Sequence, residues 1–260
     1  MPSRIIFAAA TLIFFCGCRF AGKTSPQNGN LTVSAAISME GALDEVDRDY
    51  EAANPGVTVA SNYGASGTLQ LQVEQGAPVD VYISASPKQM DELQAKGLLL
   101  EGTRRNLLQN EIVLIVPKDS SSRVSSFQDL AQPDVKPIAL GEPATVPAGE
   151  YAKEVLTYFG IYDAVKPKAL LAKDVRQVLT YVETGDVAAG IVYSTDAASS
   201  SKVKVVATAP AQSHAPAIYP VAVIKSSKEP AAARAFEDFL LSARGSAIFQ
   251  KHGFAAAANP

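Results

Sequence analysis

Short apolar segments alternate with amphipathic segments along most of the chain. Apolar runs with the length of buried strands are followed by segments in which apolar residues recur every three or four positions, as in helices. The predicted strands cover residues 31–36, 57–61, 79–84, 111–116, 138–141, 168–171, 188–193, 203–207 and 218–224. Strands that alternate with helices predict an α/β fold, in which mainly parallel sheets are flanked by helices.

Local signals mark several helix boundaries. Asp174 is typical of an N-cap, and the segment after it carries an apolar stripe at helical spacing. That stripe consists of Val175, Val178, Leu179 and Val182. Asn54-Pro55-Gly56 is expected to end the first helix, and Glu229-Pro230 to begin the last long one.

Two long apolar runs are placed where the chain would pass between two lobes. The run at 111–116 is expected to leave the first lobe, and the run at 218–224 to return to it. We therefore predict that lobe 1 comprises residues 31–110 and 220–260, and that lobe 2 comprises residues 111–219.

Composition narrows the class of protein. The chain has 260 residues, of which 47% are hydrophobic, so it is long enough for two modest α/β domains. Its formal net charge of −3 comes without any basic block, which argues against nucleic-acid binding. The only cysteines are Cys16 and Cys18, so the body of the protein has no cysteine for an internal disulfide or a thiolate metal site.

The N-terminal segment has the layout of an export signal. In residues 1–18, a charged start is followed by an apolar run too short to span a membrane and then by small residues. Small residues ahead of Cys18 resemble a bacterial lipoprotein signal, in which Cys18 would be the lipidated first residue of the mature chain. Phe15 departs from that pattern, where Leu is usual, and an ordinary cleaved signal is the alternative.

Residues 19–30 are mostly polar and are predicted to form a flexible tether. Together, signal and tether predict a protein in the periplasm or on the outer face of the cell membrane, anchored there through Cys18.

The segment 143–153 predicts a loop that turns into a helix with an accessible N-terminus. Pro147 suits the first helical position, because it has no N–H to lose there. Ala148 and Gly149 carry almost no side chain, so the free N–H groups of that first turn are open to a ligand. A helix start of this kind attracts anions.

Four predicted helix starts share this character. They lie at Ser38, Ser66, Ala148 and Val175, and Tyr193 could add a phenolic hydroxyl at the end of the strand at 188–193. In open α/β sheets, ligands bind beyond the carboxyl ends of the strands, where such helix starts converge. Each residue taken alone has a plainer explanation as an N-cap or a core residue, so the signal lies in the combination.

Seven segments carry a family resemblance. They read Val-Ser-Ala-Ala-Ile-Ser at 33–38, Gly-Ala-Ser-Gly-Thr-Leu at 64–69, Gln-Gly-Ala-Pro-Val-Asp-Val at 75–81, Val-Pro-Ala-Gly-Glu-Tyr-Ala-Lys at 146–153, Asp-Val-Arg at 174–176, Gly-Ile-Val-Tyr at 190–193 and Tyr-Pro-Val-Ala-Val at 219–223. In this order they resemble the motifs of the molybdate-binding protein (ModA type) of bacterial ABC importers. The resemblance covers nearly the whole chain after the tether.

The resemblance implies a fold, a ligand and partners. The fold would be the two-lobed periplasmic-binding-protein fold of type II, with the ligand cleft between the lobes. The ligand would be the molybdate oxyanion, and tungstate with it, bound without any cofactor. The protein would be a monomer that delivers this ion to a membrane permease driven by an ATPase.

The resemblance also assigns site residues. Ser38 and Ser66 would be hydroxyl and backbone donors, Ala148 and Val175 backbone donors, and Tyr193 a phenolic donor. These residues would contact the metal only through its oxyanion. The chain departs from many members at Ile37, Met39 and Gly67, and these differences leave the size of the pocket open.

The chemistry of the donors agrees with that ligand. Molybdate and tungstate are fully deprotonated tetrahedral dianions at neutral pH, so a pocket made only of donors matches them. Phosphate keeps a proton and would favour a site with an acceptor. Among the donor turns the one carboxylate is Asp174, which is expected to be occupied as an N-cap. Sulfate or another small oxyanion remains an alternative ligand, because it differs from molybdate mainly in size.

Enzymatic chemistry has little support. Ser66 does not lie in a Gly-x-Ser-x-Gly elbow, because residue 68 is Thr. His214 and His252 are the only histidines, and a serine hydrolase that uses His214 is a remote alternative. The chain has no phosphate loop of the Walker type, no dinucleotide fingerprint and no clustered metal ligands. We therefore expect a binding protein and not an enzyme. Arg176, beside Val175, is expected to lie in solvent or in a salt bridge between the lobes.

Overall fold

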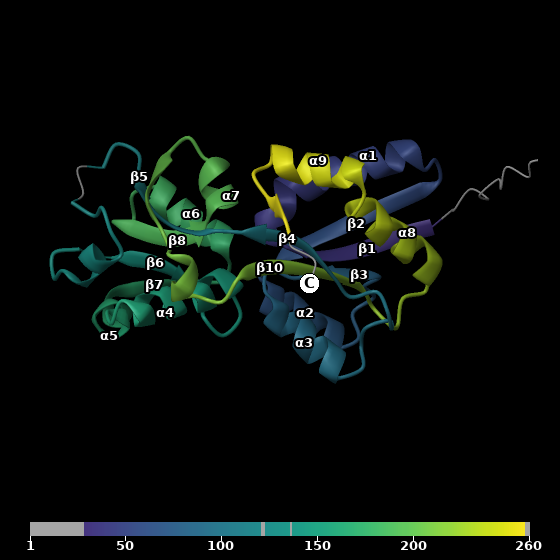
Figure 1. The fold of residues 1–260 in the computed structure, drawn as a ribbon, viewed down its shortest axis with the longest axis horizontal. Helices are drawn as coiled ribbons and strands as arrows, with labels where there is room; N and C mark the ends of the chain where they lie inside the picture. The colour runs from purple at the N-terminus through teal and green to yellow at the C-terminus, as the bar shows by residue number, and fades with distance from the viewer. Residues whose placement is uncertain (1–28, 121–122, 136, 258–260) are drawn as a thin grey trace, which may run out of the picture.

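Two lobes lie side by side and are joined by extended segments (Figure 1). The computed structural model describes residues 29–257 apart from 121, 122 and 136. The predicted signal peptide, Cys18 and the tether up to residue 28 lie outside the described residues. The tether prediction was wrong for Gly29 and Asn30, which begin the strand β1 (Gly29–Ala36) by pairing in parallel with the strand that starts at Val57. In the part of the chain that is described, no helix is long and apolar enough to cross a membrane.

Lobe 1 is built on a sheet with the order β11-β4-β10-β3-β1-β2. Its strands are β1 (Gly29–Ala36), β2 (Val57–Gly64), β3 (Val81–Ile83), β4 (Arg105–Asn110), β10 (Ala217–Val223) and β11 (Ala255–Ala256). Its helices are the 3-10 turn η1 (Ile37–Met39), α1 (Glu40–Ala53), α2 (Ser66–Glu74), α3 (Pro87–Ala95), α8 (Pro230–Leu240) and α9 (Ala243–Lys251). Figure 1 shows α1, α8 and α9 on one face of this sheet and α2 and α3 on the other.

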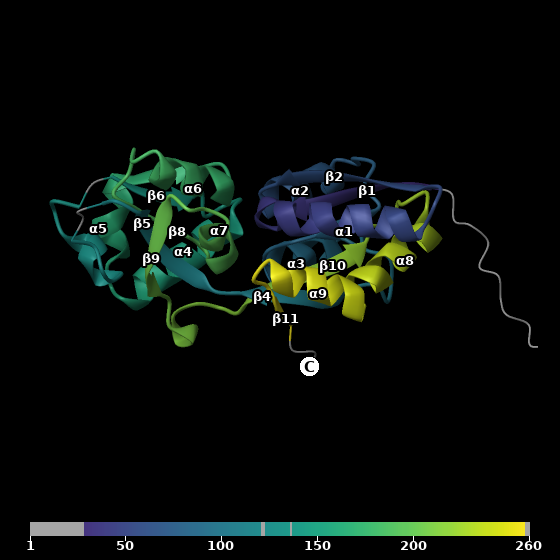
Figure 2. The same cartoon turned by 90° about the horizontal axis from the view of Figure 1, so that it is seen from above.

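Lobe 2 is built on a sheet with the order β7-β6-β8-β5-β9. Its strands are β5 (Ile112–Pro117), β6 (Ile138–Gly141), β7 (Ala169–Ala172), β8 (Ala189–Tyr193) and β9 (Val203–Thr208). Its helices are α4 (Pro147–Tyr158), α5 (Tyr162–Val165), α6 (Val175–Glu183) and α7 (Ser194–Ala198), with the 3-10 turns η2 (Gln128–Ala131), η3 (Lys166–Lys168) and η4 (Ala211–Ser213). Seen from above, the two lobes remain distinct along the whole molecule (Figure 2).

Burial explains why the apolar runs form inner strands. In β1, Leu31, Val33 and Ala35 have no exposed surface, and Ser34 on the other face is also buried. A strand with helices over both faces has no polar side, so its sequence reads as a continuous apolar run and not as an alternation. The α/β fold with two sheets flanked by helices is therefore as predicted.

The sheets are mixed, whereas the sequence pattern predicted mainly parallel ones. β1 pairs in parallel with β2 and β3, but β10 runs antiparallel to β3 and β4. In lobe 2, β6 is parallel to β7 and β8, while β5 is antiparallel to β8 and β9. The antiparallel strands are those next to the crossings between lobes, where no helix intervenes to return the chain in the parallel direction.

The chain crosses between the lobes at two places. Only Glu111 separates β4 in lobe 1 from β5 in lobe 2. On the return, β9 ends at Thr208 and β10 begins at Ala217, so the chain enters the sheet of lobe 1 three residues before the boundary expected at 220. Both crossings lie on one side of the groove between the lobes, which is the arrangement of a hinge.

Candidate functional site

A small cavity lies between the lobes, where helix N-termini from both of them meet. Its empty volume is about 200 Å³, part of it open solvent. It is lined by Ala36, Ile37, Ser38, Gly64, Ala65, Ser66, Ala85, Val146, Pro147, Ala148, Val175 and Tyr193. All five residues predicted as ligands are among them, and none of these described lining residues has a charged side chain. The structure thus brings the predicted residues together, while their contact with a ligand stays a prediction.

Ser66 begins α2 and has no exposed surface. Its Oγ accepts a hydrogen bond from the backbone N–H of Ala85 at 3.0 Å, and its carbonyl oxygen accepts one from the hydroxyl of Tyr82 at 2.7 Å. A backbone N–H can only donate, so the Ser66 hydroxyl keeps its own hydrogen for another acceptor. The bond from Ala85 therefore orients the Ser66 hydroxyl and leaves its hydrogen available to an acceptor in the cavity.

Ser38 lies in η1, the short turn that joins β1 to α1. Its Oγ lies 3.0 Å from the hydroxyl oxygen of Tyr219, a residue of β10 that is completely buried. Ser38 thus reaches the cavity from the carboxyl end of β1, as the helix-start pattern predicted.

Lobe 2 contributes two helix starts without polar side chains. Ala148 is the second residue of α4, after Pro147, and Val175 is the first residue of α6. The first N–H groups of a helix have no acceptor within the helix, so those of Ala148 and Val175 are available to a ligand. The N–H of Gly149, which was also expected to be open, instead donates to the carbonyl oxygen of Val146 at 2.9 Å. Asp174 is the N-cap of α6 and accepts a hydrogen bond from the N–H of Gln177 at 2.8 Å, which confirms the predicted cap.

A close approach between glycines places α4. The α carbon of Gly149 faces the backbone of β6, and a β carbon built on it would lie 2.1 Å from the carbonyl oxygen of Gly141. Only glycine leaves that room. The missing side chain lets the start of α4 pack directly on the end of β6, beside the cavity that Val146, Pro147 and Ala148 line.

Tyr193 ends β8 and is 1% exposed. Its hydroxyl donates to the carbonyl oxygen of Ala85 in lobe 1 at 3.2 Å. Burial raises the pKa of Tyr193 well above its ordinary value, and the nearby Tyr219 and Tyr151 raise it further. The phenol therefore stays neutral, and its one hydrogen, which is donated to Ala85 in this structure, would have to turn to the ligand for Tyr193 to act as a donor there.

Ala85 is the lining residue that the sequence patterns did not single out. Its N–H donates to Ser66 and its carbonyl accepts from Tyr193, so its backbone joins donors from the two lobes. It follows β3, as Ser38 follows β1 and Ser66 follows β2, and this position after a strand was the available signal.

Further contacts join the lobes around the cavity. The N–H of Gly67 donates to the carbonyl oxygen of Thr145 at 3.0 Å. Lys88 Nζ lies 2.7 Å from a carboxylate oxygen of Glu150. Arg176 lies 3.5 Å from Glu40 and is not among the lining residues, so it forms the salt bridge between lobes that was expected of it.

A larger groove on the surface does not share these features. Its empty volume is about 1770 Å³, part of it open solvent, and its walls combine lysines and glutamates with apolar side chains. It receives Lys88 from lobe 1, while Glu150, Lys153 and Tyr158 come from lobe 2. Solvated charges of both signs cancel one another there, so we assign the binding site to the smaller cavity, where neutral donors converge.

Metal and hydrolase chemistry find no site among the described residues. No group of three or more His, Cys, Asp or Glu side chains in that part of the chain could hold a metal ion. His214 packs edge-to-face against Tyr151 with ring centroids 5.6 Å apart, and His252 lies 2.9 Å from a carboxylate oxygen of Glu45. Neither described histidine lines the cavity beside Ser66.

Comparison with known proteins decides the family. The profile of the family described as "Bacterial extracellular solute-binding protein" matches residues 31–255. The chain belongs to this family of solute-binding proteins. Its members bind a solute and do not turn it over, in agreement with the expectation that the protein is not an enzyme.

Individual relatives cover almost the full length. The chain is 43% identical over 255 residues to the putative ABC transporter substrate-binding lipoprotein YvgL of Bacillus subtilis, with 96% of this chain and 97% of that one aligned. It is 40% identical to the molybdate-binding protein ModA of Haemophilus influenzae, again over 96% and 97% of the two chains. The substrate-binding domain of a putative molybdenum ABC transporter from Clostridium difficile has 44% identity and a TM-score of 0.69, and covers 88% of this chain and 99% of its own.

Proposed function

We propose that this solute-binding protein captures molybdate, and tungstate with it, in the cavity between its lobes. One observation carries the proposal: neutral N–H and O–H donors from both lobes converge on a cavity whose described lining residues include no charged side chain. Such a site matches an oxyanion that offers only acceptors. The relatives from Haemophilus influenzae and Clostridium difficile are named for molybdate and molybdenum, which supports the same ligand.

Energetics allow tight binding without a bound cation. A hydrogen bond to a charged group contributes roughly 1.5–3 kcal/mol net. About five to seven such donors would supply on the order of 10 kcal/mol or more before the costs of desolvation and lobe closure, and submicromolar affinity needs about 8 kcal/mol. The dipoles of α2, α4 and α6 point their positive ends at the same cavity and add to the attraction.

Binding is proposed to serve import. A two-lobed receptor that closes on its ligand has a different surface when it is loaded than when it is empty. A membrane permease with its ATPase can therefore bind the loaded form selectively. The Bacillus subtilis relative is named a lipoprotein, which supports an anchor at Cys18 after removal of a signal peptide. We propose that the protein acts as a monomer on the outer side of the membrane. Phase partition of the wild type against Cys18→Ala tests the anchor, because only the wild type should enter the detergent phase.

Calorimetric titration with four anions tests the ligand. Molybdate and tungstate should bind with submicromolar Kd, sulfate more weakly, and phosphate least, because the described lining residues include no carboxylate that could accept the proton of phosphate. Tight binding of sulfate with none of molybdate would replace this ligand by the smaller oxyanion. Absence of binding for all four would refute an oxyanion receptor.

A further inference from the structure

The side chain of Asn110 connects the crossing between the lobes to the cavity. Asn110 is the last residue of β4, next to the passage into lobe 2. Its Oδ1 accepts from the N–H of Glu111 at 2.9 Å and from the hydroxyl of Ser194 at 2.8 Å. Its Nδ2 donates to the hydroxyl oxygen of Tyr219 at 3.3 Å and to that of Thr195 at 2.9 Å.

The orientation of this amide follows from an obligatory donor. The N–H of Glu111 can only donate, so the atom of Asn110 that faces it must be the carbonyl oxygen. The other end of the amide is then the NH₂ group, which can only donate to Tyr219. Asn110 is thereby fixed as the donor, and Tyr219 as the acceptor, of the hydrogen bond between them.

The donor assignment at Tyr219 determines which hydrogen is left to Ser38. Tyr219 accepts from Asn110, so its own hydroxyl hydrogen can be donated to the Oγ of Ser38, 3.0 Å away, although the distance by itself would allow either hydroxyl to donate. Tyr219 has no exposed surface, so no solvent competes for that hydrogen. Ser38 then accepts from behind and keeps its own hydrogen for the cavity, as Ser66 does when it accepts from the N–H of Ala85.

We propose that Asn110 and Tyr219 are positioning residues of the oxyanion site, which orient the hydroxyl of Ser38 as a donor through a one-way chain of hydrogen bonds that begins at the hinge. The inference rests on the proposed function, because it assumes that the ligand accepts from Ser38. Neither residue lines the cavity, so both act through residues that do. The one hydrogen bond that joins Tyr219 to a lining residue among the described contacts is the bond to Ser38, while its ring packs edge-on against that of Tyr193 with centroids 5.5 Å apart. Aligned hydrogen bonds of this kind also strengthen one another in a buried environment.

The first test removes the hydroxyl of Tyr219. Tyr219→Phe should weaken molybdate binding about tenfold in calorimetry, since Ser38 is then free to turn its hydrogen away from the ligand. Tyr50→Phe is the matched control, because the Tyr50 hydroxyl is buried in lobe 1 and has no hydrogen-bond partner among the described residues. Tyr50→Phe should bind as the wild type does. Thermal unfolding of both variants establishes that they are folded.

Two double-mutant cycles separate this chain of bonds from a general effect on structure. Tyr219→Phe should have no further effect in a Ser38→Ala background, because the hydroxyl that it orients is gone. Asn110→Asp keeps the shape of the side chain but offers Tyr219 only acceptors, so the tyrosine must donate to it and draw the hydrogen of Ser38 inward. Asn110→Asp should therefore weaken binding more in the wild type than in a Tyr219→Phe background, where only its added charge acts.

The outcomes are distinguishable. A wild type that fails to bind molybdate refutes the proposed function itself. A wild type that binds while Tyr219→Phe binds equally well overturns the role of Tyr219. Losses that are additive in both cycles overturn the chain of bonds, because they would show that Tyr219, Asn110 and Ser38 act independently.

Discussion

The backbone N–H of Gly67 donates to the carbonyl oxygen of Thr145 at 3.0 Å, and this bond joins lobe 1 to lobe 2 beside the cavity. Gly67 follows the ligand candidate Ser66, and Thr145 lies in the loop that leads into α4. A β carbon at position 67 would lie 2.7 Å from that carbonyl oxygen. The missing side chain therefore allows the lobes to approach one another at the site.

Gly67→Ala should hold the lobes apart. We expect the affinity for molybdate to fall at least tenfold in calorimetry, because a contact of that length requires the backbone of the Thr145 loop to shift. Gly41→Ala provides the control: its β carbon would meet only the His252 ring, at 3.8 Å, and alanine favours the helix by about 0.5–1 kcal/mol. Gly41→Ala should keep the affinity and raise the unfolding temperature. Unchanged affinity in Gly67→Ala would show that closure does not depend on this contact.

Ser66→Ala removes a donor whose orientation is fixed by the Ala85 N–H. The loss of one hydrogen bond to a dianion should weaken molybdate binding about tenfold to a hundredfold. Ser34→Ala serves as the comparison, because the Ser34 hydroxyl is equally buried in lobe 1 and has no hydrogen-bond partner in the part of the chain that is described. Equal affinities for the two variants would remove Ser66 from the site.

Arg176→Gln tests whether binding needs a neutralising cation. The guanidinium group lies 3.5 Å from Glu40 across the cleft and does not line the cavity. A partly exposed ion pair contributes about 1 kcal/mol or less, so the variant should bind molybdate within about fivefold of the wild type, and the difference should shrink in high salt. A loss of several hundredfold would mean that charge neutralisation dominates, contrary to the neutral-donor site.

Asp47 should make the stability of lobe 1 dependent on pH. Burial raises the pKa of Asp47 to about 7, the carboxylates of Asp44 and Glu51 also raise it, and a hydrogen bond from Ser61 lowers it. The folded state therefore holds a proton that the unfolded state releases near pH 4, so the free energy of unfolding should fall as pH rises from about 4 to about 7.

Asp47→Asn removes that titration while its amide oxygen can still accept from Ser61. At pH 8 we expect the variant to gain about 1–3 kcal/mol relative to the wild type in urea unfolding, with little difference at pH 4. Asp238→Asn is the control, since the Asp238 side chain is 69% exposed. Parallel pH profiles for the wild type and Asp47→Asn would contradict the raised pKa.

Sequence patterns predicted the residues that line the candidate site because their signals are local. Pro147 and Asp174 each mark a helix start within a few residues, and the strands before them are continuous apolar runs, so the donors could be placed without knowing the packing. The strand β4 was missed because Arg105, Gln109 and Asn110 interrupt its apolar pattern, and α7 is too short to show a period.

What the sequence could not indicate depends on pairs that are distant along the chain. Ser38 and Tyr219 are 181 residues apart, and Asn110 is 109 residues from Tyr219. Nothing in the local pattern of any of them indicates the others. The antiparallel placement of β10 likewise depends on where the return crossing meets the first sheet, which no period in the sequence records.

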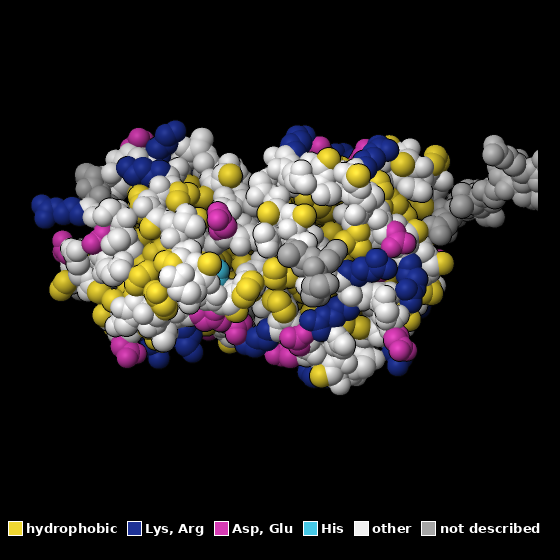
Figure 3. Space-filling view, viewed as in Figure 1, with side chains coloured by type: hydrophobic (Ala, Val, Ile, Leu, Met, Phe, Trp, Pro, Cys, Tyr) yellow, Lys and Arg dark blue, Asp and Glu magenta, His cyan; other side chains and the backbone are white. Residues whose placement is uncertain are grey.

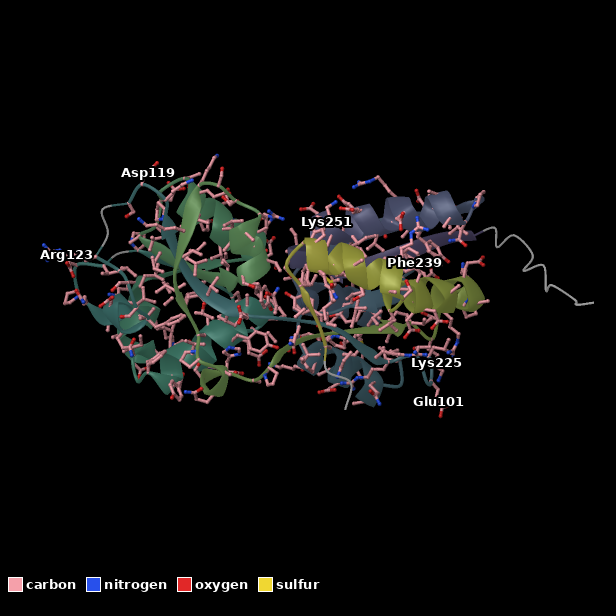
Figure 4. The ribbon with its side chains drawn as sticks, turned by 45° about the horizontal axis from the view of Figure 1, so that its top comes forward. Glu101, Asp119, Arg123, Lys225, Phe239 and Lys251 are labelled. Carbon is pink, nitrogen blue, oxygen red and sulfur yellow. The ribbon has the colours of Figure 1, made fainter. Side chains whose placement is uncertain are left out.

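Charged side chains of both signs are spread over the surface of the described residues. Figure 3 shows positive and negative side chains on both lobes of the face in view. Asp119 and Arg123 lie at the outer end of lobe 2, and Glu101 and Lys225 at the opposite outer end of lobe 1 (Figure 4). The attraction of an anion to the cavity is therefore expected to come from helix dipoles and hydrogen bonds, at short range.

The direction of β1 has a practical consequence. This strand begins at Gly29 and ends at Ala36 on the wall of the cavity, so its eight residues separate the chain entry from the cleft by about 25 Å. Whatever precedes Gly29 joins the molecule at the outer end of lobe 1 (Figure 1). A sensor surface coupled to the protein through the N-terminus would therefore leave the cleft between the lobes unobstructed, and a ligand could still enter and leave it.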